Sequence, residues 1–335
     1  MFKKGVWLHP ARDITDADSL NRTIDKLRQG GFDFIVYQVR SSEGYMACEC
    51  GGFKKNPLFR DFDPLEETVK ALKKLGVEIH VWFTDFLDRL YLTEHPDSAL
   101  IGFGGAEPVA KNGPWICPSR NDVIEYQLAQ RKAVLENYEI DGIHFDYIRY
   151  PYHSVSDPEK GRVGCICRNC RGIFSTKYGV DPLDITLHHE LWGEWVNWCV
   201  NNITSFVEKV VSLTRRVKPH AQVSAAVKPY YPYSIFQNGQ DWVDWCRRGL
   251  LDFVAPMSYT NHTSFLGKLT ELHRRYIEES LPLYEGIGAF SSVSSLTPSM
   301  LKQQIETVKS HGADGVVIFH FNKLSEEHLD VINSS

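Results

Sequence analysis

The chain repeats one pattern eight times: a short apolar segment typical of a buried strand precedes a segment whose apolar residues recur at helical spacing. The expected strands cover residues 5–9, 34–40, 77–84, 141–151, 222–228, 251–259, 283–290 and 315–322. Strands that are apolar throughout and alternate with helices are typical of a parallel sheet covered by helices. Eight such units favour a closed (β/α)8 TIM barrel over an open doubly wound sheet, and no GxGxxG or phosphate loop follows the first strand.

The length of 335 residues would allow two domains, but α/β barrels of this size commonly form one. We therefore expect a single (β/α)8 domain over residues 1–335. An insertion at about residues 152–191 follows the fourth expected strand and carries a cluster of cysteines. The sequence leaves the oligomeric state open.

Charge and hydropathy narrow the classes of partner. The net charge of -5, without a basic stripe, argues against a nucleic-acid partner. No apolar run approaches the ~20 residues that span a bilayer, so we expect no membrane partner. The N-terminal residues lack the apolar region and cleavage site of a secretion signal, which predicts a cytoplasmic location.

The fourth expected strand, residues 141–151, mixes apolar residues with ionisable ones. Side chains alternate along a strand, so His144 and Asp146 share one face while Ile143 and Phe145 take the other. An unpaired charge is costly to bury, so this pair lies either at an open strand end or among satisfying partners. In a (β/α)8 barrel the active site lies where the strands end, which favours the first reading for Asp146.

Polar and aromatic side chains gather at the other expected strand ends as well. The candidates for substrate binding are His9, Arg40, Trp82, His144, Arg149, Lys228, Tyr259 and His320. A ring of polar groups with aromatic members suits a sugar, whose hydroxyls take hydrogen bonds and whose apolar face stacks on an aromatic ring. His9, Trp82, Tyr259 and His320 could instead be interior barrel packing with one satisfied polar tip. His144 could be a satisfied core histidine, and Arg149 a loop residue that pairs elsewhere.

Glycoside hydrolysis normally uses two carboxyl groups, and the sequence offers one strong candidate, Asp146. For its partner we consider Glu43 after the second strand, Asp85 at the end of the third and Glu285 within the seventh. Glu285 could instead be a buried structural acid bonded to a neighbouring Arg or Lys, and Asp85 a helix cap or solvated loop acid. A lysine paired with Asp146, such as Lys228, would depress the pKa of that carboxyl and suit a nucleophile or base.

The segment Gly142-Ile-His-Phe-Asp-Tyr-Ile-Arg-Tyr-Pro151 resembles the fourth-strand signature of the glycosyl hydrolase-like 10 group of (β/α)8 barrels. Residues 5–9, 77–83 and 252–259 resemble the same group at the first, third and sixth strands, so the likeness covers most of the chain. The resemblance implies a carbohydrate-active TIM barrel, expected to be a glycosidase acting on a polysaccharide or glycan.

A more distant likeness joins the same strand to chitinase-type barrels, whose fourth strand reads Asp-Gly-x-Asp-x-Asp-x-Glu. Asp141, Gly142 and Asp146 match that pattern, but His144 and Ile148 replace two of its acids. Ile148 takes the place of the proton-donating Glu, so the chitinase mechanism is not carried over to this chain.

Eight cysteines are unevenly spaced, and Cys165, Cys167 and Cys170 lie within six residues. Structural zinc commonly takes four tetrahedral Cys or His ligands, so these three thiols and one remote residue would suffice. Cys48 and Cys50 form a second candidate group, and the sequence does not name the fourth ligand. The alternatives are reduced thiols or a local disulfide.

Three functional hypotheses follow. The first is a glycoside hydrolase that needs no cofactor for catalysis, because no HxH or HExxH pair indicates a catalytic metal. The second is a carbohydrate-binding barrel without catalysis, which a missing second carboxylate near Asp146 would favour. The third is a metal-dependent deacetylase or hydrolase.

Overall fold

The computed structural model describes residues 2–104, 109–110, 113–152 and 157–335. Its main sheet has eight parallel strands in the order β8-β7-β6-β3-β2-β1-β10-β9. Isolated parallel bridges from Val254 to Leu283 and from Met257 to Gly286 join the two outer strands, so the sheet closes into a barrel. The strands are β1 (Lys3–Leu8), β2 (Phe34–Arg40), β3 (Glu78–Thr84), β6 (Gly142–Asp146), β7 (Gln222–Val227), β8 (Phe253–Pro256), β9 (Tyr284–Gly288) and β10 (Gly315–Phe319). The predicted (β/α)8 barrel is confirmed.

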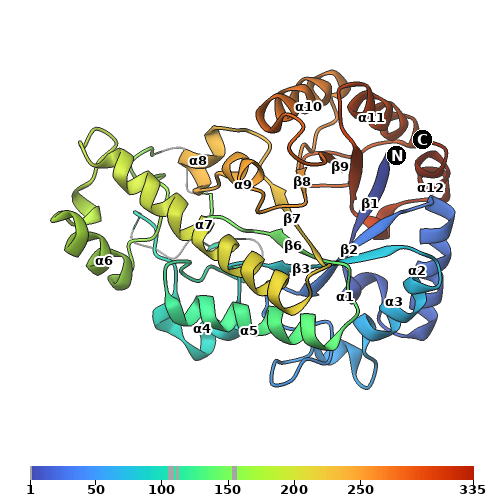
Figure 1. Cartoon of the computed structure of the whole chain (residues 1–335), viewed down its shortest axis with the longest axis horizontal. Helices are drawn as coiled ribbons and strands as arrows, with labels where there is room; N and C mark the ends of the chain where they lie inside the picture. The colour runs from blue at the N-terminus through green and yellow to red at the C-terminus, as the bar shows by residue number, and fades with distance from the viewer. Residues whose placement is uncertain (1, 105–108, 111–112, 153–156) are drawn as a thin grey trace.

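At least one helix follows each barrel strand, and one helix per strand covers the outside of the sheet (Figure 1). These helices are α2 (Ala17–Gly30), α3 (Pro64–Lys73), α5 (Asn121–Asn137), α7 (Trp192–Val217), α9 (Trp242–Arg247), α10 (Thr263–Ile277), α11 (Pro298–Ser310) and α12 (Glu326–Asn333). Shorter elements lie in the connections: α1 (Pro10–Asp13), α4 (Arg89–Glu94), α6 (Arg168–Tyr178), α8 (Tyr233–Asn238), the hairpin of β4 (Val109–Ala110) and β5 (Gly113–Pro114), and the 3-10 turns η1 (Pro57–Phe59), η2 (Pro96–Ser98), η3 (Pro182–Asp184) and η4 (Phe321–Lys323). The sequence analysis did not anticipate these shorter elements.

Local signals explain where the long helices begin and end. The Asp63 side chain accepts hydrogen bonds from the N–H groups of Leu65 and Glu66, which caps the start of α3. Helix α2 ends at Gly31, which has φ of 59° and adopts the left-handed conformation that glycine tolerates best.

Two apolar clusters divide the barrel into an inside and an outside. The inner cluster consists of Trp7, Phe34, Val36, Trp82, Ala226, Phe253, Ala255 and Val317. Phe34 and Phe253 belong to strands that are not neighbours, yet their ring centroids lie 5.7 Å apart. Residues at the intervening positions, such as Ile35 and Val254, belong to the larger core between strands and helices. Strand alternation therefore decides which side chains face the interior.

Strand β6 ends earlier than the sequence predicts. Tyr147 has φ of 57°, a left-handed conformation that turns the chain out of the sheet directly after Asp146. Residues 148–151, expected to continue the strand, therefore form a loop. The expected insertion follows it, and its helix α6 projects from the barrel together with the first turns of α7 (Figure 1).

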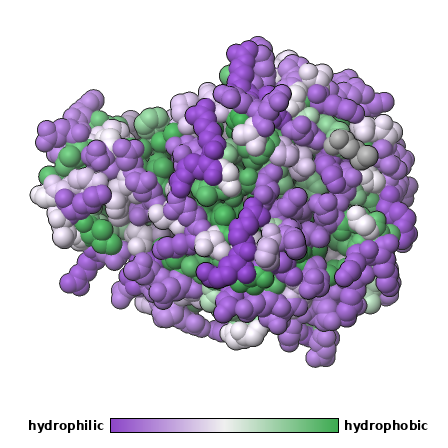
Figure 2. Space-filling view, in the orientation of Figure 1, coloured by the Kyte–Doolittle hydropathy of each residue, from purple (hydrophilic) through white to green (hydrophobic). Residues whose placement is uncertain are grey.

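Figure 2 shows a face on which hydrophilic side chains predominate, with apolar residues in smaller patches between them. Among the described residues, no helix combines the length and the apolar character needed to cross a bilayer.

Candidate active site

A pocket of about 470 Å³ opens where the barrel strands end. Its lining residues are Trp7, Trp82, Asp146, Tyr147, Arg149, Tyr152, Lys228, Pro229, Tyr230, Met257, Tyr259, Ser291, Ser292, Val293 and Phe319. The volume falls within the range of small-molecule sites, and aromatic rings make up much of the wall. The pocket therefore has the position and lining expected of a binding site in this fold.

Asp146 is the last residue of β6. Among the described residues that line the pocket, it is the one that carries a carboxylate. Its Oδ1 accepts a hydrogen bond of 2.7 Å from the N–H of Tyr147, so the turn that ends the strand also orients the carboxylate. Burial raises the pKa of Asp146 to about 6, and the nearby charges of Arg149 and Lys228 offset that effect only in part. Lys228 does lower the pKa of Asp146, but the cost of removing the carboxylate from water outweighs that effect, so the net pKa is raised.

Lys228 follows β7 and lines the same pocket as Asp146, close enough for the two charges to interact. Burial, with a contribution from the positive charge of Arg149, lowers the pKa of Lys228 to about 7, against the pull of Asp146. The ammonium nitrogen lies 4.4 Å from the ring centroid of Tyr152, a cation–π contact. Both the protonated and the neutral amine are thus accessible near neutral pH.

Arg149 lies in the loop after β6 and is held mainly by aromatic rings. Its guanidinium carbon lies 5.2 Å from the ring centroid of Trp115 and 5.1 Å from those of Tyr147 and Tyr152. One guanidinium nitrogen donates to the carbonyl of Tyr150 at 3.0 Å. The rings position this cation without neutralising its charge, which leaves the charge to act on the pocket.

Tyr259, Phe319 and Trp7 form one wall of the pocket. Tyr259 and Phe319 stack with centroids 5.4 Å apart and planes at 18°, and Trp7 meets both rings edge-on. Burial, together with the negative charge of Asp146, holds the pKa of Tyr259 well above its usual range. Tyr259 therefore keeps its hydroxyl proton and can donate a hydrogen bond to a ligand.

The predicted histidines lie behind this wall instead of lining the pocket. His144 is fully buried, with Nδ1 2.8 Å from the hydroxyl of Ser224 and its ring against Trp7. Burial holds the pKa of His144 well below its usual range.

His9 and His320 have ring centroids 6.0 Å apart, and burial lowers their pKa values to about 3 and about 4. All three histidines are therefore neutral near pH 7. His9 also supports Trp82 edge-on, with centroids 5.5 Å apart.

Arg40 lies outside the barrel, away from the pocket. A register shift between Gln38 and Arg40 pairs Arg40 with Phe83, whose side chain packs in the outer core. The bulge thus reverses the alternation at the end of β2. Arg40 is fully buried, pairs with Asp88 at 2.5 Å and donates to the carbonyl of Thr84.

Asp85 also faces outward, because it lies three positions after the inward-facing Trp82. Its carboxylate is fully buried and pairs with Arg131 on α5. Burial raises the pKa of Asp85, and the charges of Arg131 and Arg40 oppose the rise. The Asp85 N–H donates to the Asp146 carbonyl oxygen at 2.9 Å, so the two acids lie on adjoining backbone but on opposite faces.

Glu285 points out of the barrel toward α10, since the neighbouring Gly286 faces Trp7 inside. The carboxylate accepts a hydrogen bond from Ser258 and lies 3.1 Å from Nδ1 of His273. It is a buried acid with partners, although these are a serine and a histidine instead of the Arg or Lys expected.

Glu43 lies on the exposed outer loop after β2 and pairs with Arg89 at 2.7 Å. The structure therefore brings together Asp146, Trp82, Arg149, Lys228 and Tyr259 of the predicted residues, and places the others elsewhere. The sequence analysis did not name Trp7, Tyr147, Met257, Ser291, Ser292, Val293 or Phe319 as site residues, although all line the pocket. The alternation of side chains along a strand could have identified Trp7 and Phe319 as site residues. Both lie on apolar strands, shortly before a polar residue at the strand end.

The cysteine cluster forms a second feature, outside the pocket lining. Cys117 from the loop after β3 joins Cys165, Cys167 and Cys170, and all four sulfur atoms lie within 4.8 Å of one another. Cys117 thus supplies the fourth ligand position that the sequence left unnamed. Cys48 and Cys50 lie apart from this group, with their own sulfur atoms 2.9 Å apart.

A closed (β/α)8 barrel carries its functional site at the C-terminal face of the strands, which is where Asp146, the cations and the aromatic rings meet in this chain. The family model of the glycosyl hydrolase-like 10 family matches residues 3–295. The chain therefore belongs to that family, which confirms the resemblance found in its sequence.

The chain is also similar to curated proteins. The chain is 25% identical over 271 residues to an S-layer-related protein of Niallia circulans, covering 69% of this chain and 17% of the relative. It is 18% identical over 278 residues to the glycosyl hydrolase YngK of Bacillus subtilis, covering 71% and 48%. This chain therefore spans less than half the length of either relative.

Among solved structures, the glycoside hydrolase domain of PgaB (BpsB) from Bordetella bronchiseptica aligns with a TM-score of 0.73 at 13% identity, covering 95% of this chain and 94% of that domain. The alpha-L-fucosidase isoenzyme 2 of Paenibacillus thiaminolyticus aligns with a TM-score of 0.74 at 16% identity, covering 99% and 48%. At these identities the likeness establishes the fold.

Proposed function

We propose that this protein is a glycoside hydrolase that acts on a polysaccharide or glycan, with Asp146 as its principal carboxylate. The observation that carries the proposal is the presence of Asp146 in a pocket at the strand ends, whose lining also includes Lys228 and several aromatic rings. Stacking on Trp or Tyr rings suits the apolar face of a sugar. The membership of the glycosyl hydrolase-like 10 family supports the same chemistry.

Asp146 and Lys228, two ionisable groups that line the pocket, suit complementary roles. With a pKa of about 6, Asp146 is mainly ionised at pH 7, as a base or nucleophile requires. Lys228, with a pKa of about 7, is partly protonated at the same pH and is our candidate proton donor. In the proposed reaction Lys228 protonates the leaving glycosidic oxygen, water attacks the anomeric carbon, and Asp146 takes the proton of that water. Asp146 and Lys228 then return to their starting states by proton exchange with solvent.

A carbohydrate-binding barrel without catalysis is the second candidate. It is favoured by one observation: among the described residues that line the pocket, Asp146 is the single carboxylate, whereas glycosidases normally use two. The three acids considered as partners face the outer core or lie on the outer loop.

The metal-dependent alternative finds less support. In the described part of the chain, the one group of His, Cys, Asp and Glu side chains suited to a metal is the cysteine cluster, which does not line the pocket. We therefore propose catalysis by protein side chains with no cofactor. The cytoplasmic location and the absence of nucleic-acid and membrane partners stay predictions.

The decisive experiment is a glycan-library screen of the wild-type protein for both binding and hydrolysis, followed by Asp146→Asn on any substrate found. We expect Asp146→Asn to lower kcat/KM by about 10²–10⁴-fold. The matched control is Asp18→Asn, an exposed acid at the start of α2, which should leave the rate unchanged. An unaltered rate in Asp146→Asn would reject the assigned role. Binding without hydrolysis by the wild type would establish the second candidate.

A further inference from the structure

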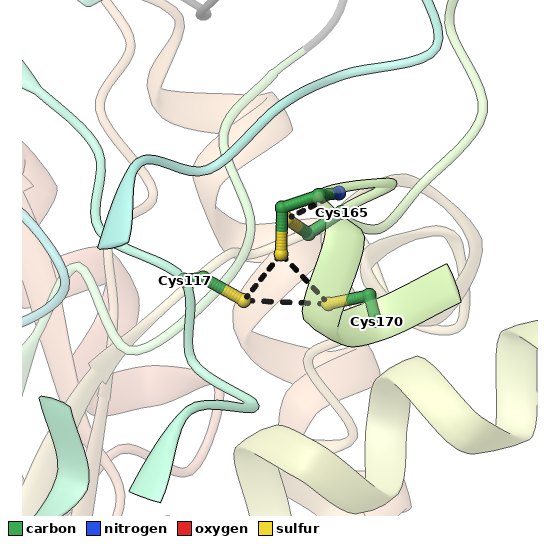
Figure 3. Close-up of side chains that lie close together, drawn as sticks. Cys117, Cys165 and Cys170 are labelled. Carbon is green, nitrogen blue, oxygen red and sulfur yellow. Dashed lines mark hydrogen bonds between the residues drawn. The ribbon is translucent and has the colours of Figure 1, made fainter. Parts of the chain in front are cut away.

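Four buried cysteine side chains converge on one point between two loops of the barrel. Figure 3 shows Cys117, Cys165 and Cys170 directed toward one another. The Cys117 sulfur lies 3.4 Å from that of Cys170 and 3.8 Å from that of Cys167, and 3.6 Å separates the sulfurs of Cys167 and Cys170. Residues about fifty positions apart in the chain therefore meet in one compact group.

These separations match a mononuclear tetrahedral centre. A zinc ion bound at about 2.3 Å by four thiolates places its sulfur atoms roughly 3.8 Å apart, at the corners of a tetrahedron. A disulfide would require about 2.0 Å between two sulfurs and would leave the other pair unexplained. An iron–sulfur cubane would hold its four thiolates farther apart, because iron and sulfide atoms lie between them.

The backbone around the cluster suits negatively charged sulfur. Cys167 caps the N-terminus of α6 and Cys170 lies in its first turn, where the helix presents its positive end. The N–H groups of Ile101 and Cys167 donate to the Cys165 sulfur at 3.4 and 3.5 Å.

The Ser119 hydroxyl, in the same loop after β3 as Cys117, also contacts the cluster. It lies 3.1 Å from the Cys117 sulfur and 2.9 Å from the Cys170 sulfur. Groups of this kind hold thiolate ligands in orientation and offset the charge of a four-thiolate zinc site.

We propose that Cys117, Cys165, Cys167 and Cys170 bind one structural zinc ion. All four positions are filled by protein ligands, which is typical of structural and not of catalytic zinc. The ion pins the loop after β3 to the insertion after β6. Trp115, two residues before Cys117, contacts Tyr147 and Arg149 at the pocket, so the clamp also fixes part of the pocket wall. The proposal does not depend on the glycosidase assignment.

The test is metal analysis of the full chain, purified under reducing conditions without chelator. We expect about one equivalent of zinc per chain. The Cys117→Ala variant should lose most or all of that zinc. The matched control is Cys246→Ala, a change at a buried cysteine outside the cluster, and it should retain the zinc. Wild-type protein without bound metal, and unable to take up added zinc, would overturn the proposal, as would equal zinc retention in both variants.

A second measurement keeps the proposal testable if Cys117→Ala does not fold. Wild-type protein refolded with Co²⁺ should show the visible bands and the sulfur-to-metal charge-transfer band of tetrahedral cobalt thiolate. A thiol-blocking reagent should release the metal, and hydrogen exchange should then rise in residues 115–120 and 165–178. A cobalt spectrum of six-coordinate oxygen ligation, or release without any change in exchange at these loops, would contradict the clamp.

Discussion

Asp85 and Asp146 lie at neighbouring strand ends and share a backbone hydrogen bond, yet their carboxylates have opposite surroundings. Asp85 faces the helices, is fully buried and pairs with Arg131. Asp146 faces the pocket and stays partly exposed, and no ion pair joins it to Lys228 or Arg149 in the described part of the chain. The difference teaches that pairing a buried charge commits it to stability, whereas leaving it unpaired at an open strand end keeps it able to titrate.

The largest effect is expected from breaking the buried ion pair between Asp85 and Arg131. Asp85→Asn leaves Arg131 buried without its counter-charge, so we expect a loss of about 3–5 kcal/mol in the free energy of unfolding. Denaturant unfolding followed by circular dichroism measures the loss. The double change Asp85→Leu with Arg131→Met should recover much of it, because no charge is left buried. Equal instability of the single and double variants would contradict the account.

Removal of the positive charge of Lys228 should lower activity instead of stability. Lys228→Met keeps the length of the side chain but cannot donate a proton, and we expect kcat to fall by about 10²-fold with little change in stability. The measurement is steady-state kinetics on the substrate found by the glycan screen. Full activity in Lys228→Met would assign the proton donor to another group.

Replacement of Asp146 should change stability in the opposite direction to replacement of Asp85, because no buried counter-charge is left behind when Asp146 is removed. Burial raises the pKa of Asp146 to about 6, so ionising it opposes folding: the stability present below about pH 4 is lost as the pH rises through 6. Asp146→Asn should therefore stabilise the fold above pH 6 by about 1–3 kcal/mol, with the gain shrinking toward pH 4.5. Thermal unfolding at several pH values tests this. A destabilised Asp146→Asn at pH 7.5 would show that the carboxylate is paired after all.

The rate should follow the same two groups. If Asp146 must be ionised and Lys228 protonated, kcat/KM rises with pH through about 6 and falls above about 7, which gives a narrow bell. Lys228→Met should remove the descending limb from its residual activity. A profile that is flat between pH 5 and 8 would exclude both assignments.

The sequence predicted the barrel because eight apolar segments at regular intervals leave few other architectures. It predicted Asp146 because that residue shares a strand face with His144 and precedes a loop. Alternation could also have removed Asp85, since Trp82 and Asp85 are an odd number of positions apart and cannot face the same way.

Other parts of the site could not be predicted from single residues. The bulge that turns Arg40 outward leaves no clear mark in residues 34–40, and Glu285 and Gly286 could be told apart only once one was known to face inward. Cys117 is an isolated cysteine about fifty positions before its partners. Only the folded loops bring it to the cluster.

Closure of the barrel between β8 and β9 rests on the isolated bridges from Val254 to Leu283 and from Met257 to Gly286. The other neighbouring barrel strands are joined by ladders of at least four residue pairs, with one register shift between β2 and β3. We therefore expect the pairing between β8 and β9 to open before the rest of the barrel. Because Met257 also lines the pocket, transient opening there would widen the pocket from the side while the rest of the sheet stays paired.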